Sequence, residues 1–100
     1  MKNPTSQKSD AKVVERELTI RNKLGIHARP AALFVKTAGR FASDITVEKD
    51  GNRVSGKSIM GLMTLEGYQG SKLRIRAEGE DAEEAVQALE ELVEKGFYED

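Results

Sequence analysis

Several residue types that carry reactive chemistry are absent or nearly absent from this 100-residue chain. It has no cysteine, which excludes disulfide bonds and thiolate sites. One histidine without any cysteine argues against a zinc site, and we expect neither a metal nor another cofactor. No apolar run approaches the roughly 20 residues that cross a bilayer, so we expect no membrane segment.

An excess of charge of one sign is also lacking. The 16 Lys and Arg residues nearly balance the 17 Asp and Glu residues, and this argues against a nucleic-acid-binding protein. A hydrophobic fraction of 38% supports the core of one small domain. Residues 1–12 are polar and lack the apolar segment of a secretory signal. We therefore expect a flexible tail there, a domain over residues 13–98 and a cytoplasmic protein.

The single histidine lies in residues 22–32, which read Asn-Lys-Leu-Gly-Ile-His-Ala-Arg-Pro-Ala-Ala. This pattern is typical of a strand end, a turn and the first turn of a helix. Pro30 favours the helix start, because the N–H groups of a first turn have no intrahelical partners and a proline costs little there. The pattern predicts that His27 lies at or beside the helix N-cap.

Such a position suits phosphoryl transfer through histidine. The attacking imidazole must be neutral, as a free imidazole mostly is at pH 7, and the positive end of a helix dipole favours the neutral ring further. After transfer, the free N–H groups of the helix start and the guanidinium of Arg29 would stabilise the phosphoryl group. A lone histidine is, however, more often an ordinary surface residue or a helix cap without chemistry, so the local chemistry of His27 does not decide its function by itself.

Hydrophobic periodicity predicts the strands and helices. The expected strands span residues 14–21, 45–48, 52–55 and 72–78. The expected helices span residues 28–38, 58–65 and 82–93. Within the short middle helix, Leu62 and Leu65 are expected in the core. Single-faced strands with helices between them predict an α+β fold, with an antiparallel or mixed sheet covered on one side by helices.

Local signals predict how some of these elements begin or turn. Asp50-Gly51 marks a tight turn between the two middle strands. Ser58 is a natural N-cap for the short helix. Asp81 and Glu84 resemble a capping box for the last helix. The first strand carries one charged residue, Arg16, on its otherwise apolar face.

Residues 51–58, Gly-Asn-Arg-Val-Ser-Gly-Lys-Ser, fit the phosphate-loop pattern G-x-x-x-x-G-K-S at every fixed position. Taken alone, this motif would indicate an ATP- or GTP-hydrolysing enzyme. A phosphate loop follows a buried parallel strand, however, whereas residues 45–48 alternate as a half-exposed strand does. No apolar strand ending in Asp follows to hold magnesium, so we expect no nucleotide site.

Two motifs, in this order, resemble those of one known family. Gly-Ile-His-Ala-Arg-Pro-Ala-Ala at residues 25–32 and Gly-Lys-Ser-Ile-Met-Gly at residues 56–61 resemble the histidine-containing phosphocarrier (HPr) family of the phosphoenolpyruvate-dependent phosphotransferase system. The resemblance runs from about Glu15 to about Phe97. It implies an open-faced β-sandwich of order βαββαβα, in which a four-stranded antiparallel sheet has three helices on one face.

The resemblance also implies a function and its residues. His27 would accept a phosphoryl group on Nδ1 from enzyme I and pass it to a histidine of an enzyme IIA-type protein, while Arg29 orients the group. The protein would be a cytoplasmic, monomeric carrier in sugar transport rather than a stand-alone enzyme. Exposed apolar side chains of Ile59, Met60 and Met63 would form the docking patch for these partners.

The role of Ser58 and the identity of the acceptor stay open. Ser58 matches the serine that a dedicated HPr kinase/phosphorylase modifies in many relatives, so regulation competes with a simple capping role. The alternative function is a purely regulatory binding module switched at Ser58, which would not need a histidine at position 27. Residues 65–70 depart from familiar sugar-transport members, and residues 22–25 are similar to the nitrogen-related branch of the family.

Overall fold

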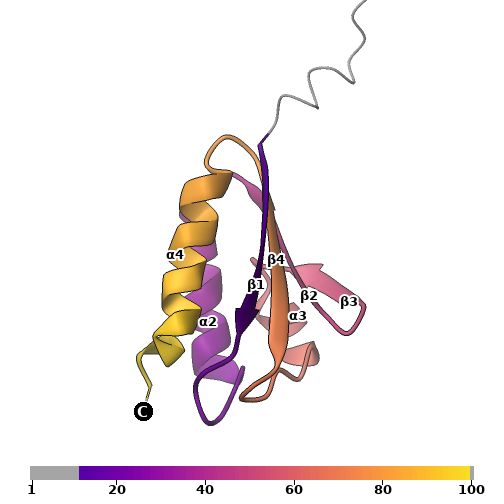
Figure 1. The fold of residues 1–100 in the computed structure, drawn as a ribbon, viewed down its shortest axis with the longest axis vertical. Helices are drawn as coiled ribbons and strands as arrows, with labels where there is room; N and C mark the ends of the chain where they lie inside the picture. Colours follow the sequence, from indigo (N-terminus) through magenta and orange to yellow (C-terminus); the bar gives the residue numbers. More distant parts are fainter. Residues whose placement is uncertain (1–11, 100) are drawn as a thin grey trace, which may run out of the picture.

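A four-stranded antiparallel sheet with its helices on one face forms the frame of the computed structural model, which describes residues 12–99 (Figure 1). The elements in chain order are β1 (Val13–Thr19), α2 (Ala28–Ala38), β2 (Asp44–Lys49), β3 (Asn52–Ser55), α3 (Ile59–Thr64), β4 (Lys72–Glu78), α4 (Ala82–Glu94) and the 3₁₀ turn η1 (Gly96–Tyr98). The strand order is β1-β4-β2-β3. The predicted α+β, open-faced arrangement is confirmed. The predicted tail, residues 1–12, lies outside the described residues except for Lys12.

The core lies between the sheet and the two long helices. Alternate residues of β4 turn Leu73, Ile75 and Ala77 inward, and all three are buried. The facing stripe of α4 is buried over its whole length and comprises Ala82, Ala85, Val86, Leu89, Leu92 and Val93. From α2, Phe34 is fully buried. In the described part of the chain, no helix is long and apolar enough to cross a membrane.

Arg16 shows how a charged residue fits the inward face of β1. Its side chain is half-buried, and its guanidinium lies 3.2 Å from the carboxylate of Glu90 and 3.8 Å from that of Glu83. Both partners belong to α4, which packs against β1. At Arg16, β1 therefore contacts α4 through ion pairs, whereas Leu18 on the same face of the strand is buried in the apolar core.

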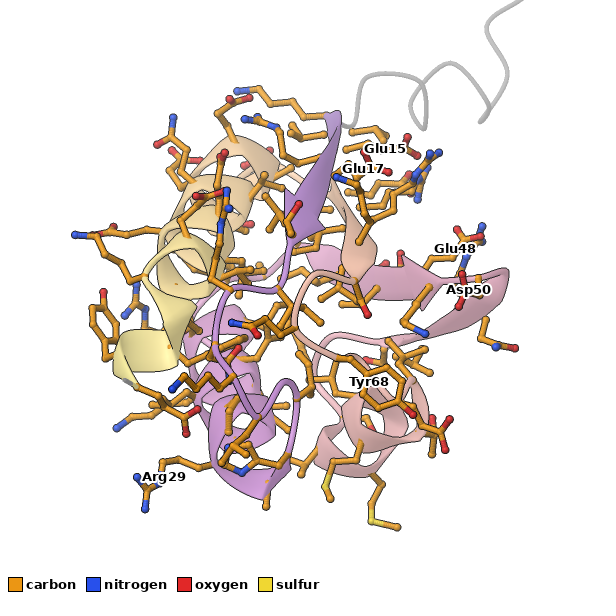
Figure 2. All side chains as sticks on the ribbon, turned by 60° about the horizontal axis from the view of Figure 1, so that its bottom comes forward. Glu15, Glu17, Arg29, Glu48, Asp50 and Tyr68 are labelled. Carbon is orange, nitrogen blue, oxygen red and sulfur yellow. The ribbon has the colours of Figure 1, made fainter. Side chains whose placement is uncertain are left out.

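The other face of the sheet carries charged side chains of both signs. Figure 2 shows Glu15, Glu17 and Glu48 on this face. Arg76 of β4 pairs with Glu15 across the strands at 3.4 Å and with Glu78 at 3.2 Å. Such exposed pairs contribute little stability each, about 0–1 kcal/mol, but they keep this face compatible with water.

The hairpin of β2 and β3 rules out a phosphate loop at residues 51–58. Asp50 and Gly51 have positive φ values of 53° and 82°, as a two-residue hairpin turn requires, and Lys49 pairs with Asn52. The motif thus spans a turn, a strand on the sheet edge and a second turn. It does not form a loop between a buried strand and a long helix.

The predicted capping box at Asp81 is wrong. Asp81 occupies the N-cap position of α4, but its side chain makes no capping hydrogen bond. Its carboxylate instead accepts hydrogen bonds from the backbone N–H groups of Ala42 at 2.8 Å and Ser43 at 3.0 Å, and from the Ser43 hydroxyl. A contact distant in sequence has therefore replaced the local one, and it ties the start of α4 to the loop before β2.

These bonds make Asp81 a source of pH-dependent stability. The Ser43 hydroxyl and then the Ala42 N–H hold the pKa of Asp81 below its usual value of 3.8. Because this pKa is lower in the folded than in the unfolded chain, the stabilisation is complete above about pH 3.8. It is lost as the pH falls through the lower folded value.

We predict that Asp81→Asn lowers the unfolding midpoint at pH 7 and weakens its fall at acid pH. An amide offers one acceptor oxygen where the carboxylate offers two, and it does not titrate. Urea unfolding measured between pH 2.5 and pH 7 checks this, with Asp44→Asn as the matched control at an exposed position. Equal midpoints for Asp81→Asn and wild type across this range would contradict the assignment.

Candidate functional site

His27 lies at the N-cap of α2, where the sequence predicted it. Its backbone is extended, with φ −104° and ψ −166°, and its carbonyl accepts the N–H of Ala31 at 3.0 Å. Pro30 is buried in the first helical turn. The backbone of His27 therefore stands at the junction between an irregular loop and the positive end of an 11-residue helix.

The loop before His27 depends on a glycine. Gly25 has a φ of +70°, and a Cβ built there would lie 2.1 Å from the carbonyl oxygen of Gly67. This close approach lets the N–H of Ile26 donate to the same carbonyl at 2.9 Å. The backbone N–H of His27 then donates to the Gly25 carbonyl at 3.1 Å. Since only glycine fits these contacts, Gly25 fixes the direction in which the chain enters the helix.

The hydrogen-bond partner of the His27 imidazole comes from outside its own helix. The imidazole makes no capping hydrogen bond. Its Nε2 instead lies 3.0 Å from Oε2 and 3.4 Å from Oε1 of Glu99. The imidazole is 38% exposed and the Glu99 side chain only 15%. A partly shielded carboxylate thus holds one ring nitrogen, and the ring stays open to solvent.

Asn22 donates a hydrogen bond to this carboxylate. It is a buried polar residue, 3% exposed, on the loop that follows β1. Its side-chain amide donates to the Gly25 carbonyl at 2.8 Å and to Oε1 of Glu99 at 2.9 Å. The sequence pattern did not indicate this role for Asn22. The one signal that could have found it was an amide residue at the start of the motif that contains His27.

The turn after α4 brings Glu99 to the site. Three successive residues, Gly96, Phe97 and Tyr98, have φ values of 62°, 56° and 59°. The Phe97 ring is buried in the core and anchors the turn. Figure 1 shows that the end of the described chain lies at the same end of the molecule as the start of α2. Glu99 is one residue beyond the predicted domain boundary, and no periodicity or motif pointed to it.

Arg29 projects into solvent from the first turn of α2. It is exposed, and Figure 2 shows its side chain extending away from the body of the protein. A shallow groove beside it is lined by Leu24, Arg29, Leu33, Phe97, Tyr98 and Glu99. The cation and the carboxylate that contacts His27 therefore line one groove.

The second motif forms α3, which packs against α2. The hydroxyl of Ser58 accepts the N–H of Gly61 at 2.9 Å, so Ser58 is the N-cap, as predicted. Leu62 and Leu65 are buried, also as predicted. The remaining apolar side chains lie at the surface, with exposed fractions of 40% for Ile59, 76% for Met60 and 40% for Met63. Contiguous exposed apolar side chains of this kind are typical of interaction sites.

Comparison with known families gives a clear match. The model of the family described as "PTS HPr component phosphorylation site" covers residues 14–95. This chain belongs to the HPr family. It is 49% identical over 88 residues to the phosphocarrier protein HPr of Xylella fastidiosa, and the match covers 88% of this chain and 99% of that protein. The resemblance inferred from the two sequence motifs is thereby confirmed.

Solved HPr-family structures confirm the fold as well. The crystal structure of HPr from Thermoanaerobacter tengcongensis matches with a TM-score of 0.84 at 53% identity, over 87% of this chain and 98% of that one. The Crh protein of Bacillus subtilis, described as a dimer with a swapping domain, matches with a TM-score of 0.66 at 47% identity, over 82% of this chain and 94% of that one. The family thus includes the carrier HPr and the catabolite-repression protein Crh.

We predict that Gly25→Ala destabilises the protein by about 3 kcal/mol or more, because it combines backbone strain with a clash against a carbonyl oxygen. The matched control is Gly70→Ala. Gly70 also has a positive φ, +90°, but a methyl group there would meet nothing within 4 Å. It should cost only about 1 kcal/mol. Chemical unfolding of both variants checks this, and equal losses would show that the contact with Gly67 is unimportant.

Proposed function

We propose that this HPr-family protein carries a phosphoryl group on His27. In this proposal, His27 accepts the group from enzyme I and passes it to a histidine of an enzyme IIA-type protein. The observation that carries the proposal is the placement of His27 at the start of α2 with Nε2 held by Glu99. This arrangement leaves Nδ1 as the nitrogen with no carboxylate against it, in agreement with the attachment that the family resemblance implies.

The surroundings suit both states of such a carrier. Before transfer, the neutral imidazole has a lone pair that can attack phosphorus. After transfer, the N–H groups in the first turn of α2 and the guanidinium of Arg29 can bind the phosphoryl oxygens. The protein itself needs no cofactor for this step, since the donor supplies the activated group. It acts as a carrier with a phosphohistidine intermediate and not as a stand-alone enzyme.

The partners would dock on the exposed apolar surface of α3. Ile59 adds exposed apolar area, and Met60 and Met63 offer flexible, polarizable side chains, which suit a surface that meets more than one partner. We further propose that residues 13–98 form the carrier domain and that it acts in the cytoplasm. The proposal takes this carrier to be a monomer.

We predict that wild type, incubated with phosphoenolpyruvate and enzyme I, gains one acid-labile phosphate and that His27→Ala gains none. Mass spectrometry before and after mild acid treatment measures this directly. Since the His27 ring is not part of the core, the variant should fold normally. A His27→Ala protein that still takes up acid-labile phosphate would overturn the proposal.

A second variant tests whether Arg29 contacts the phosphoryl group. Arg29→Ala should still be phosphorylated but about tenfold more slowly, because a charge-assisted contact to the phosphoryl group is lost. The initial rate of phosphate uptake from enzyme I measures this. The matched control is Arg53→Ala on the exposed hairpin, which should react like wild type. Equal rates for the two variants would show that Arg29 does not contact the phosphoryl group.

Regulation at Ser58 is a second, separable proposal. In it, a dedicated kinase phosphorylates Ser58, whose hydroxyl caps α3 beside the exposed apolar residues of that helix. A phosphate there adds about −1.5 to −2 charges at the docking surface. The alternative of a purely regulatory module switched at this serine is less favoured, because such a module has no need of the arrangement around His27.

We predict that Ser58→Asp keeps the fold, since Asp is also a good N-cap, but slows phosphorylation of His27 by enzyme I about fivefold at low salt. The deficit should shrink as salt screens the added charge. Stopped-flow or quenched-flow transfer rates at two salt concentrations check this. The matched control is Asn52→Asp, which adds the same charge at the hairpin turn. If Ser58→Asp and genuine phosphoserine both leave the rate unchanged, Ser58 is only a cap.

A further inference from the structure

The carboxylate of Glu99 joins the far end of the chain to the ring of His27. We propose that Glu99 is a positioning residue: it selects the tautomer of His27 that has its lone pair on Nδ1, and it stabilises the charge that the ring gains during phosphoryl transfer. The proposal rests on the carrier function proposed above and deepens it. It is drawn from a series of hydrogen bonds that begins at the backbone of the loop before His27.

The side-chain amide of Asn22 has a fixed orientation. Two acceptors, the Gly25 carbonyl and Oε1 of Glu99, lie 2.8 Å and 2.9 Å from its Nδ2. A carbonyl and a carboxylate can only accept, so the NH₂ group of the amide must face both of them. Turning the amide over would place its oxygen against two other oxygens. The orientation of Asn22 is therefore set by the backbone of Gly25.

The carboxylate of Glu99 sets the tautomer of His27. Because Oε1 of Glu99 already accepts from Asn22, the other oxygen, Oε2, is directed at Nε2 of the ring at 3.0 Å. An ionised carboxylate has no proton to donate, so Nε2 must carry the hydrogen. The neutral ring then has its lone pair on Nδ1. A carboxylate that orients an imidazole plays the same part in other histidine-dependent sites.

The ring of His27 gains a positive charge during phosphoryl transfer. The Nδ1 lone pair forms a bond to the phosphorus of the donor, a phosphohistidine of enzyme I, while the donor's N–P bond breaks and its electron pair leaves with the donor imidazole. The hydrogen on Nε2 stays in place, so the ring of His27 becomes positively charged. The carboxylate of Glu99 then faces a cation, and Glu99 neither gains nor loses a proton. On delivery to the acceptor, the same steps run in reverse.

The backbone around Glu99 supports a functional placement. Phe97 and Tyr98 both have positive φ values although neither is glycine. Such conformations are unfavourable for these residue types and persist where the surroundings determine them. The buried ring of Phe97 holds the turn, and the N–H of Glu99 donates to the Gly96 carbonyl at 3.0 Å. The strained turn directs the side chain of Glu99 toward His27, although residue 99 is near the end of the chain.

The decisive variant is Glu99→Gln. Its single acceptor oxygen is claimed by the NH₂ group of Asn22, so its own NH₂ group faces Nε2 of His27 and donates to it. This moves the ring hydrogen to Nδ1 and blocks the attacking lone pair. Glu99→Ala removes the acceptor without imposing the wrong tautomer. The proposal therefore predicts that the isosteric amide is worse than alanine, whereas a role in packing alone would make it better.

Nitrogen-15 NMR of the free protein at about pH 8.5, where histidine is usually neutral, reads the tautomer without any partner. We expect the Nε2–H form in wild type, a mixture in Glu99→Ala and the Nδ1–H form in Glu99→Gln. The specificity constant for phosphorylation by enzyme I should fall about fivefold in Glu99→Ala and by about tenfold or more in Glu99→Gln. The matched control is Glu94→Gln, whose carboxylate pairs with Arg21 instead, and it should match wild type in both measurements.

The outcomes separate this proposal from the carrier function. If wild type carries phosphate on His27 and both Glu99 variants react as fast as wild type, the positioning role is overturned and the carrier function stands. An Nε2–H tautomer in Glu99→Gln, or a larger loss in Glu99→Ala than in Glu99→Gln, would also overturn it. If wild type takes up no phosphate on His27, the carrier function fails instead, while the tautomers still report whether Glu99 orients the ring.

Discussion

The hydrogen bond between Nε2 of His27 and the carboxylate of Glu99 is the constraint on which the site depends. It joins residues 72 positions apart over 3.0 Å, so it requires both ends of the fold to be in place. On one side, Gly25 must pass close to the Gly67 carbonyl so that the loop enters α2 correctly. On the other, Phe97 must be seated in the core so that the last turn reaches back. The ring of His27 is therefore held by the whole domain and not by its own helix alone.

The sheet provides the rigid base for this arrangement. β4 pairs with β1 on one side and β2 on the other, and α4 packs over β1 and β4. β1 leads into the loop before His27, and α4 leads into the turn before Glu99. Because β1 and α4 pack against each other, the two residues of the hydrogen bond follow neighbouring elements. The apolar surface of α3 lies on a separate helix that packs against α2. The fold thus separates the residues that hold the ring from those proposed to meet partners.

The sequence predicted the features that depend on local periodicity and turn chemistry. The bounds of α2, the Asp50-Gly51 hairpin and the Ser58 cap all follow from short-range rules, and they agree with the structure. The capping box at Asp81 was wrong because Ser43 and Ala42, distant in sequence, compete for its carboxylate. Glu99 was missed for the same reason: nothing near residue 99 indicates that a left-handed turn brings it to His27. The docking roles of Ile59, Met60 and Met63 stay predictions.

The central claim is that His27 carries the phosphoryl group on Nδ1 while its Nε2–H remains hydrogen-bonded to Glu99. The most direct measurement is NMR of the phosphorylated protein with nitrogen-15 in the imidazole ring. The account predicts a one-bond coupling between phosphorus and Nδ1, and a proton on Nε2 that exchanges slowly because the carboxylate holds it. A phosphorus coupling to Nε2, or phosphate on any residue other than His27, would contradict it.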